Sequence, residues 1–121
     1  MNSYKQLIVL QKAYELSLLV YSVTKSFPKE ELFWITSQIR RASVSIISNI
    51  AEGNARGGKK EYVQFLWIAF SSGAEVETQL LLCKDLGLIK EGDYIKMSSL
   101  LTEVMKMLNA LIKKLSINWI Y

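Results

Sequence analysis

Polar side chains recur at helical spacing in two stretches of this 121-residue sequence, and they are the first candidates for chemistry. They are Gln38, Ser45, Asn49 and Glu52 in one stretch, with Arg41 beside them, and Ser72, Glu75 and Gln79 in the other. Such spacing places each set on one side of a helix. The two sets could line a pocket for a ligand or nucleotide. We favour a polar seam, a hydrogen-bond network that fixes how two helices align, in which Arg41 neutralises Glu75 or Glu52.

The residue types needed for enzymatic chemistry are largely missing. The sequence contains no His, which excludes Ser-His and Cys-His nucleophile pairs, His metal ligands and the commonest general base. Cys83 falls on the apolar side of a predicted helix, as a core residue would. Residues 53–58 are rich in glycine, but no strand precedes them and no Gly-Lys-Ser/Thr follows, so they do not form a phosphate-binding P-loop. We therefore expect a non-enzymatic protein with no catalytic residues, metal site or cofactor.

Basic residues give the stronger functional indication. Arg56, Lys59 and Lys60 cluster around the glycine-rich stretch, where one predicted helix ends and the next begins. Lysines at a helix start oppose the helix dipole and make that start a better site for phosphate. Arg40 points outward from the preceding helix, and Arg41 could join it in contacting phosphates. The formal net charge of +4 is a mild excess, so an ordinary solvated loop is the alternative to a nucleic-acid site.

Four predicted helices position these residues, and no strand pattern is visible. Apolar residues recur every three or four positions over residues 4–25, 29–54, 60–86 and 91–115. Pro28 and the glycines after residue 52 mark the first two breaks. Because such short connections force neighbouring helices to run antiparallel, the sequence predicts an all-α, up-down-up-down four-helix bundle. This bundle forms a single domain over residues 1–121.

The third predicted helix carries a second apolar face, opposite its core side. The core side is expected to include Ile68, just as Leu32 is expected in the core at the start of the second helix. The opposite stripe holds Val63, Trp67, Phe70, Ala74 and Leu81, with no charge among them. A stripe of this kind on a soluble protein usually marks an interface, and we expect it to mediate self-association. The alternative is a skewed bundle in which Trp67 covers its own core; the apolar tail, residues 116–121, is a second candidate contact.

The sequence favours a cytoplasmic location with no membrane partner. A single Cys leaves no intramolecular disulfide. The longest uncharged run, residues 62–74, is shorter than the roughly 20 apolar residues that a membrane span needs. The first residues also lack the pattern of a signal peptide.

Several segments resemble the signature of the 23S rRNA intervening-sequence proteins, also called the four-helix bundle protein family. They are Phe27-Pro28-Lys29-Glu30-Glu31, Gln38-Ile39-Arg40-Arg41-Ala42-Ser43-Val44-Ser45-Ile46, Asn49-Ile50-Ala51-Glu52-Gly53, and Phe65-Leu66 followed by Ala69, Ser72, Glu75, Gln79 and Leu80. The similarity covers nearly the whole chain. The chain departs from the family pattern at Leu10, Ile47 and Ser71, where members usually have Trp, Pro and Gly.

The resemblance implies small bacterial proteins, some encoded inside insertions in large-subunit ribosomal RNA genes, that form a homopentameric, barrel-like ring. The accessory variability determinant of diversity-generating retroelements is similar; it is a basic pentamer that binds nucleic acid and a reverse transcriptase. We therefore predict a cyclic homo-oligomer that holds a nucleic-acid backbone through repeated basic residues. These residues are Arg40, Arg41, Arg56, Lys59 and Lys60. The alternative is a structural or adaptor oligomer that binds a protein partner through the apolar stripe and has no nucleic-acid role.

Overall fold

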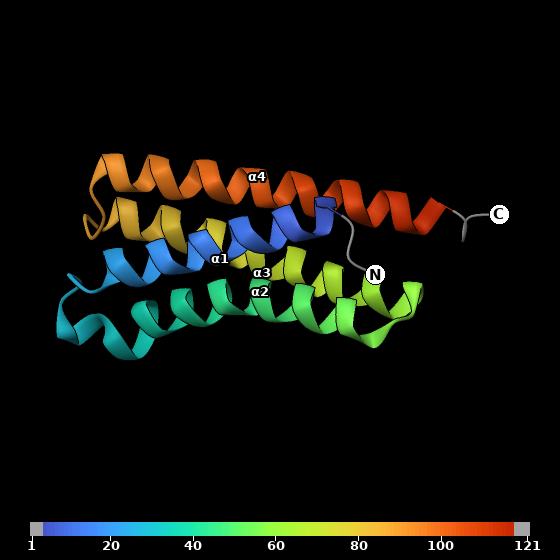
Figure 1. Cartoon of the computed structure of the whole chain (residues 1–121). Helices are drawn as coiled ribbons and strands as arrows, with labels where there is room; N and C mark the ends of the chain where they lie inside the picture. Colours follow the sequence, from blue (N-terminus) through green and yellow to red (C-terminus); the bar gives the residue numbers. More distant parts are fainter. Residues whose placement is uncertain (1–3, 118–121) are drawn as a thin grey trace.

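A computed structural model describes residues 4–117, which form a bundle of four α-helices without strands (Figure 1). The helices are α1 (Tyr4–Thr24), α2 (Ser37–Arg56), α3 (Lys59–Asp85) and α4 (Glu91–Ser116). α1 packs against α2 and α4, α3 packs against the same two helices, and the most extensive contact joins α2 to α3. The predicted all-α four-helix fold is thereby confirmed. Within the described part of the chain, every helix is too short or too polar to cross a membrane.

The connection between α1 and α2 departs from the regular helix predicted over residues 29–54. A 3-10 turn, η1 (Lys29–Glu31), is followed by a π-helical turn, η2 (Leu32–Thr36), before α2 begins. A π-helical turn holds more residues than an α-helical turn, so the side chains before α2 are rotated away from α-helical periodicity. Leu32, predicted in the core, is therefore 42% exposed, whereas Ile35 is buried.

Two glycines with left-handed backbone conformations end helices. Gly57 (φ 86°) follows α2, and Gly87 (φ 76°) follows the end of α3. At Gly87 the chain forms a Schellman motif: Leu88 N donates to Cys83 O at 2.9 Å, and Gly87 N donates to Lys84 O at 3.0 Å. Other residues rarely adopt this conformation, so the two glycines fix where the helices stop.

The core runs along the bundle and takes one face from each helix. Its fully buried side chains include Leu16, Ile46, Leu66, Leu80 and Leu108. Burying a side chain of this size contributes roughly 1.5–3 kcal/mol. Rows of Leu, Ile and Val therefore hold the four helices together.

The buried face of α3 is rotated relative to the prediction. Ile68, predicted in the core, is 48% exposed, and Val63, predicted on the outer stripe, is 4% exposed. The reason is that α3 packs against both α2 and α4, so its buried arc must be wide enough to contact both helices. Tyr62, Val63 and Leu66 lie in that arc, while Ser72 lies at the edge that meets α2.

Candidate nucleic-acid interface

The α2–α3 turn and the C-terminal end of α4 lie at the same end of the bundle (Figure 1). The turn carries Arg56, Lys59 and Lys60, and the last turn of α4 carries Lys113 and Lys114. All five side chains are exposed. We call these five residues the basic end.

Two carboxylates beside the α2–α3 turn, Glu52 and Glu61, both bind Arg56. Arg56 Nη2 lies 2.8 Å from Glu52 Oε2, and Arg56 Nη1 lies 3.3 Å from Glu61 Oε2. The guanidinium also lies over the Phe65 ring, 5.2 Å from its centroid. The hydrogen bond from Arg56 to Glu52, together with the charges of Glu52 and Glu61, raises the pKa of Arg56. Arg56 is therefore held by protein groups, and the four lysines supply the remaining positive charge of the basic end.

Arg41 lies away from the basic end, in the seam between α2 and α3. Its Nη2 donates to Glu75 Oε2 at 2.7 Å and to Gln38 Oε1 at 3.0 Å. Glu52, the other carboxylate considered for Arg41, pairs with Arg56 instead. Both members of the Arg41–Glu75 pair are about half exposed, so the pair contributes at most about 1 kcal/mol to stability.

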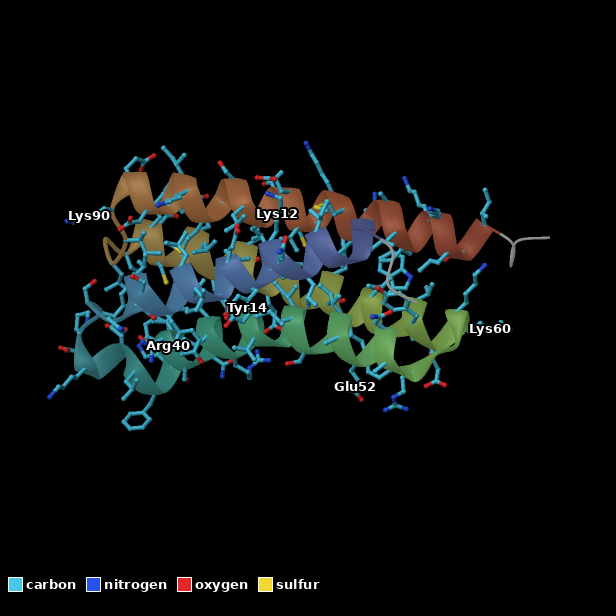
Figure 2. All side chains as sticks on the ribbon, viewed as in Figure 1. Lys12, Tyr14, Arg40, Glu52, Lys60 and Lys90 are labelled. Atoms are coloured by element: carbon cyan, nitrogen blue, oxygen red, sulfur yellow. The ribbon has the colours of Figure 1, made fainter. Side chains whose placement is uncertain are left out.

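Arg40 lies at the opposite end of the bundle from Lys60 (Figure 2). Its Nε donates to Thr24 Oγ1 at 2.9 Å, and its guanidinium lies over the Tyr21 ring, 4.7 Å from the centroid. These contacts join α2 to α1. The structure thus brings Arg56, Lys59 and Lys60 together and separates Arg40 and Arg41 from them.

Lys113 and Lys114 were not among the residues predicted from the sequence. In an up-down-up-down bundle the second and fourth helices finish at the same end of the molecule. The predicted topology therefore implies that these lysines lie at the same end of the bundle as the α2–α3 turn. Lysines are also common at helix C-termini because they complement the dipole, so their positions alone do not mark them as functional.

Polar residues of the seam make a connected set of hydrogen bonds, of which one joins α2 to α3 and the others lie within α2. The Ser45 and Ser72 hydroxyls lie 2.8 Å apart, and Asn49 Nδ2 donates to Ser45 Oγ at 3.0 Å and to Ser45 O at 2.8 Å. Gln79 is half-buried, and its Oε1 accepts no hydrogen bond within the described residues. Contacts of this kind restrict how α2 and α3 can slide past each other.

The outer surface of α3 carries several exposed apolar side chains among polar ones. Trp67 and Leu81 are 48% and 46% exposed, and Ala74 is exposed as well. Phe70 is half-buried against the core, and its ring meets Trp67 in a T-shaped contact with centroids 5.6 Å apart. The exposed side chains Ile68 and Leu82 extend this surface. The apolar face of α3 is therefore Trp67, Ile68, Ala74, Leu81 and Leu82.

Cys83 lies in the core of the bundle. Cys83 is fully buried. This burial, with a smaller effect of the Glu31 charge, raises the pKa of the Cys83 thiol to about 11, so the thiol stays protonated near neutral pH. Within the part of the chain that the structure describes, no group of three or more His, Cys, Asp or Glu residues converges.

Comparisons with known proteins agree with this architecture. The model of the family described as 23S rRNA-intervening sequence protein matches residues 5–110. A crystal structure from Bacteroides thetaiotaomicron VPI-5482, described as a protein with unknown function from the S23 ribosomal protein family, is 27% identical. It aligns with a TM-score of 0.83 and covers 90% of this chain and 98% of that chain. No curated protein matches.

Proposed function

The chain belongs to the family of 23S rRNA-intervening sequence proteins, and we propose that it is a non-enzymatic, cytoplasmic module that holds a nucleic-acid backbone at its basic end. The observation that carries this proposal is the position of Lys59, Lys60, Lys113 and Lys114 at one end of the bundle. Glu52 and Glu61, the carboxylates beside the turn, are bound to Arg56. Positive charge concentrated in this way attracts nucleic acid and releases its counterions.

The proposed contacts go to phosphates rather than to bases. Lysines that bind phosphate fix position on the backbone but carry no sequence information. We therefore expect binding that depends strongly on salt and weakly on sequence.

We also propose that the chain assembles into a cyclic homo-oligomer, a pentamer as the family resemblance implies. The apolar face of α3 supports this proposal, because an exposed apolar surface on a soluble protein usually marks an interface. In a ring, the basic end would repeat with each copy. A net charge of +4 per chain would then become a dense positive surface.

The test is the binding of a fluorescent single-stranded RNA, followed by anisotropy between about 50 and 200 mM salt. Affinity should fall steeply as salt rises. The double variants Lys59→Ala/Lys60→Ala and Lys113→Ala/Lys114→Ala should each flatten the logarithmic slope by about 0.7 for every phosphate that the protein no longer neutralises. The matched control Lys25→Ala/Lys29→Ala removes two exposed lysines from the other end and should leave the slope unchanged. Salt-independent binding, or an equal effect of the control, would overturn the proposal.

The second candidate function is that of an adaptor, favoured by the exposure of Trp67 and Leu81 on α3. A protein partner, such as the reverse transcriptase that the resemblance implies, would then dock on the apolar face of α3. Such binding should tolerate salt, because it depends on apolar burial. It should disappear in Trp67→Ala and persist in Lys59→Ala/Lys60→Ala.

A further inference from the structure

We propose that the apolar face of α3 docks on a second apolar face, formed by α1 and α2, of a neighbouring copy of this chain. We call this second surface the α1–α2 face. The inference rests on the proposed homo-oligomer and deepens it, because it names the two surfaces that meet between copies. The α1–α2 face comprises Tyr14, Leu18 and Tyr21 of α1, and Val44, Ile47, Ser48 and Ala51 of α2.

Contacts between α1 and α2 place these residues on one side of the bundle. The Arg40 guanidinium of α2 lies over the Tyr21 ring, 4.7 Å from its centroid, so Tyr21 lies on the flank of α1 that meets α2. Tyr14 and Leu18 precede Tyr21 by seven and three residues, which puts them on the same side of the helix. Figure 2 shows Tyr14 on the α2 side of α1. Val44 follows Arg40 by one helical turn and shares its flank of α2.

The α1–α2 face is exposed and carries little charge. Its three α1 residues and Val44 are between 39% and 57% exposed. Residues 42–51 of α2 contain no charged side chain. Arg40, at the edge of the face, already donates a hydrogen bond to Thr24 Oγ1. Covering this face with apolar surface would therefore remove few charges from water, which keeps the cost of docking low.

The apolar face of α3 has matching properties and lies across the bundle from α1. The two helices both pack against α2 and α4, so they stand diagonally opposite each other. On each face four large apolar side chains are between 39% and 57% exposed, and together they can bury roughly 400 Å². A standard interface buries about 800 Å² of each partner, a little over half of it nonpolar. One contact between the two faces is therefore large enough for a stable interface.

Two separate faces on one chain favour a head-to-tail contact. An isologous dimer would use one face twice and leave the other in water. A heterologous contact covers both faces of every copy and generates a ring where the rotation closes. Neighbouring copies in a ring are related by a rotation alone, so bundles that stand along the ring axis meet at equal heights. All the basic ends then lie on one rim of the ring.

Equal heights place the largest side chain of one face against the smallest side chains of the other. The Ser45 hydroxyl of α2 and the Ser72 hydroxyl of α3 lie 2.8 Å apart and mark one height of the bundle. Because α2 and α3 run antiparallel, Trp67, five residues before Ser72, is level with the residue five positions after Ser45. The exposed side chains of α2 around that height are Ser48 and Ala51. These small residues leave room for the indole of the neighbouring copy.

The test mixes two variants and measures mass by light scattering at high protein concentration. Trp67→Arg puts a charge on the apolar face of α3 and leaves the α1–α2 face intact, and Tyr14→Arg does the reverse. Both side chains are about half exposed, so neither change disturbs the core, as circular dichroism should confirm. The control Ile95→Arg changes an exposed apolar residue of α4 and should assemble like the wild type.

Each variant alone should be monomeric, because every contact needs one face of each kind. An equimolar mixture should instead give dimers, with twice the mass of the 13.8 kDa chain. The reason is that the intact α1–α2 face of Trp67→Arg can still bind the intact apolar face of α3 in Tyr14→Arg. The second contact of each copy is blocked, so the mixture cannot grow beyond the dimer.

Three results would overturn the inference. Dimers of each variant alone would show that each face pairs with itself. An unchanged mass in Tyr14→Arg would show that the α1–α2 face lies outside the interface. A mixture that stays monomeric while the wild type assembles would show that the two faces do not meet. A monomeric wild type would contradict the homo-oligomer and with it this inference, whereas RNA binding at the basic end is tested separately by its salt slope.

Discussion

Arg41 donates a 2.7 Å hydrogen bond from Nη2 to Glu75 Oε2, across the seam between α2 and α3. Gln38 Oε1 accepts from the same guanidinium, at 3.0 Å from Nη2 and 3.2 Å from Nε. These contacts hold Arg41 within the protein. They indicate that Arg41 helps to align α2 and α3. The proposed phosphate contacts therefore come from the basic end and not from Arg41.

We expect Arg41→Ala to lower the free energy of unfolding by no more than about 1 kcal/mol, because the Arg41 and Glu75 side chains are 53% and 46% exposed. A double-mutant cycle with Glu75→Ala, followed by urea unfolding, measures the coupling directly. The salt slope of RNA binding should not change in Arg41→Ala. A slope flattened as much as in Lys59→Ala/Lys60→Ala would instead make Arg41 a phosphate contact.

The four helices could be predicted because apolar periodicity and strong breaks such as Pro28 are local properties of the sequence. The rotation of α3, and of the residues just before α2, could not be predicted as well. The π-helical turn before α2 moved Leu32 out of the core, and no residue type specifies such a turn. Likewise, Val63 is buried and Ile68 is exposed because α3 packs against both α2 and α4. Which helices contact α3 is decided only when the whole bundle assembles.

The candidate site likewise contains some residues that the sequence could reveal and others that only the structure reveals. Arg56, Lys59 and Lys60 could be found because they are close in sequence. Lys113 becomes a neighbour of that turn only through the bundle topology.

Gly53 lies where α2 and α3 approach closely. A Cβ at Gly53 would fall 2.6 Å from Phe65 Cβ and 2.9 Å from Tyr62 Cδ1. We expect Gly53→Ala to lower the free energy of unfolding by about 1–3 kcal/mol, because the helices must separate to admit the methyl group. Urea unfolding monitored by circular dichroism measures the change.

Gly92 provides the matched control for Gly53. It lies in the first turn of α4, and a Cβ there would meet nothing within 4 Å among the described residues. Gly92→Ala should be neutral or should stabilise the protein by up to about 1 kcal/mol. If Gly53→Ala were as stable as Gly92→Ala, the close packing of α2 on α3 would not matter for stability.

Trp67 is the residue whose removal should most affect self-association. Light scattering should give the wild type a mass that is a multiple of the 13.8 kDa chain, and five times that mass for a pentamer. Trp67→Ala should lower the mass, because it removes a large apolar contact from the apolar face of α3. The control Ile95→Ala removes an exposed apolar side chain from α4 and should leave the mass unchanged. A wild-type protein that is monomeric in solution would contradict the proposed cyclic homo-oligomer.

Cys83 should make stability depend on pH in the alkaline range. Burial, followed by the charge of Glu31, raises the pKa of the Cys83 thiol from 9.0 to about 11. Between these two values the folded state holds more protons than the unfolded state, so the free energy of unfolding falls as pH rises. The stabilisation is complete below about pH 9 and is lost by about pH 11, a change of order 2–3 kcal/mol.

The control for this effect is Cys83→Ala, compared with wild type by urea unfolding at about pH 8 and about pH 10. The variant should be less stable than wild type at the lower pH, because it leaves a small cavity in the core. The difference in the free energy of unfolding between wild type and variant should be smaller at the higher pH, because the Cys83 thiol of the wild type has begun to ionise there. The raised pKa of Tyr62 acts in both proteins and cancels in this difference. If this difference in the free energy of unfolding were the same at both pH values, the Cys83 thiol would have the same pKa in the folded and unfolded chains.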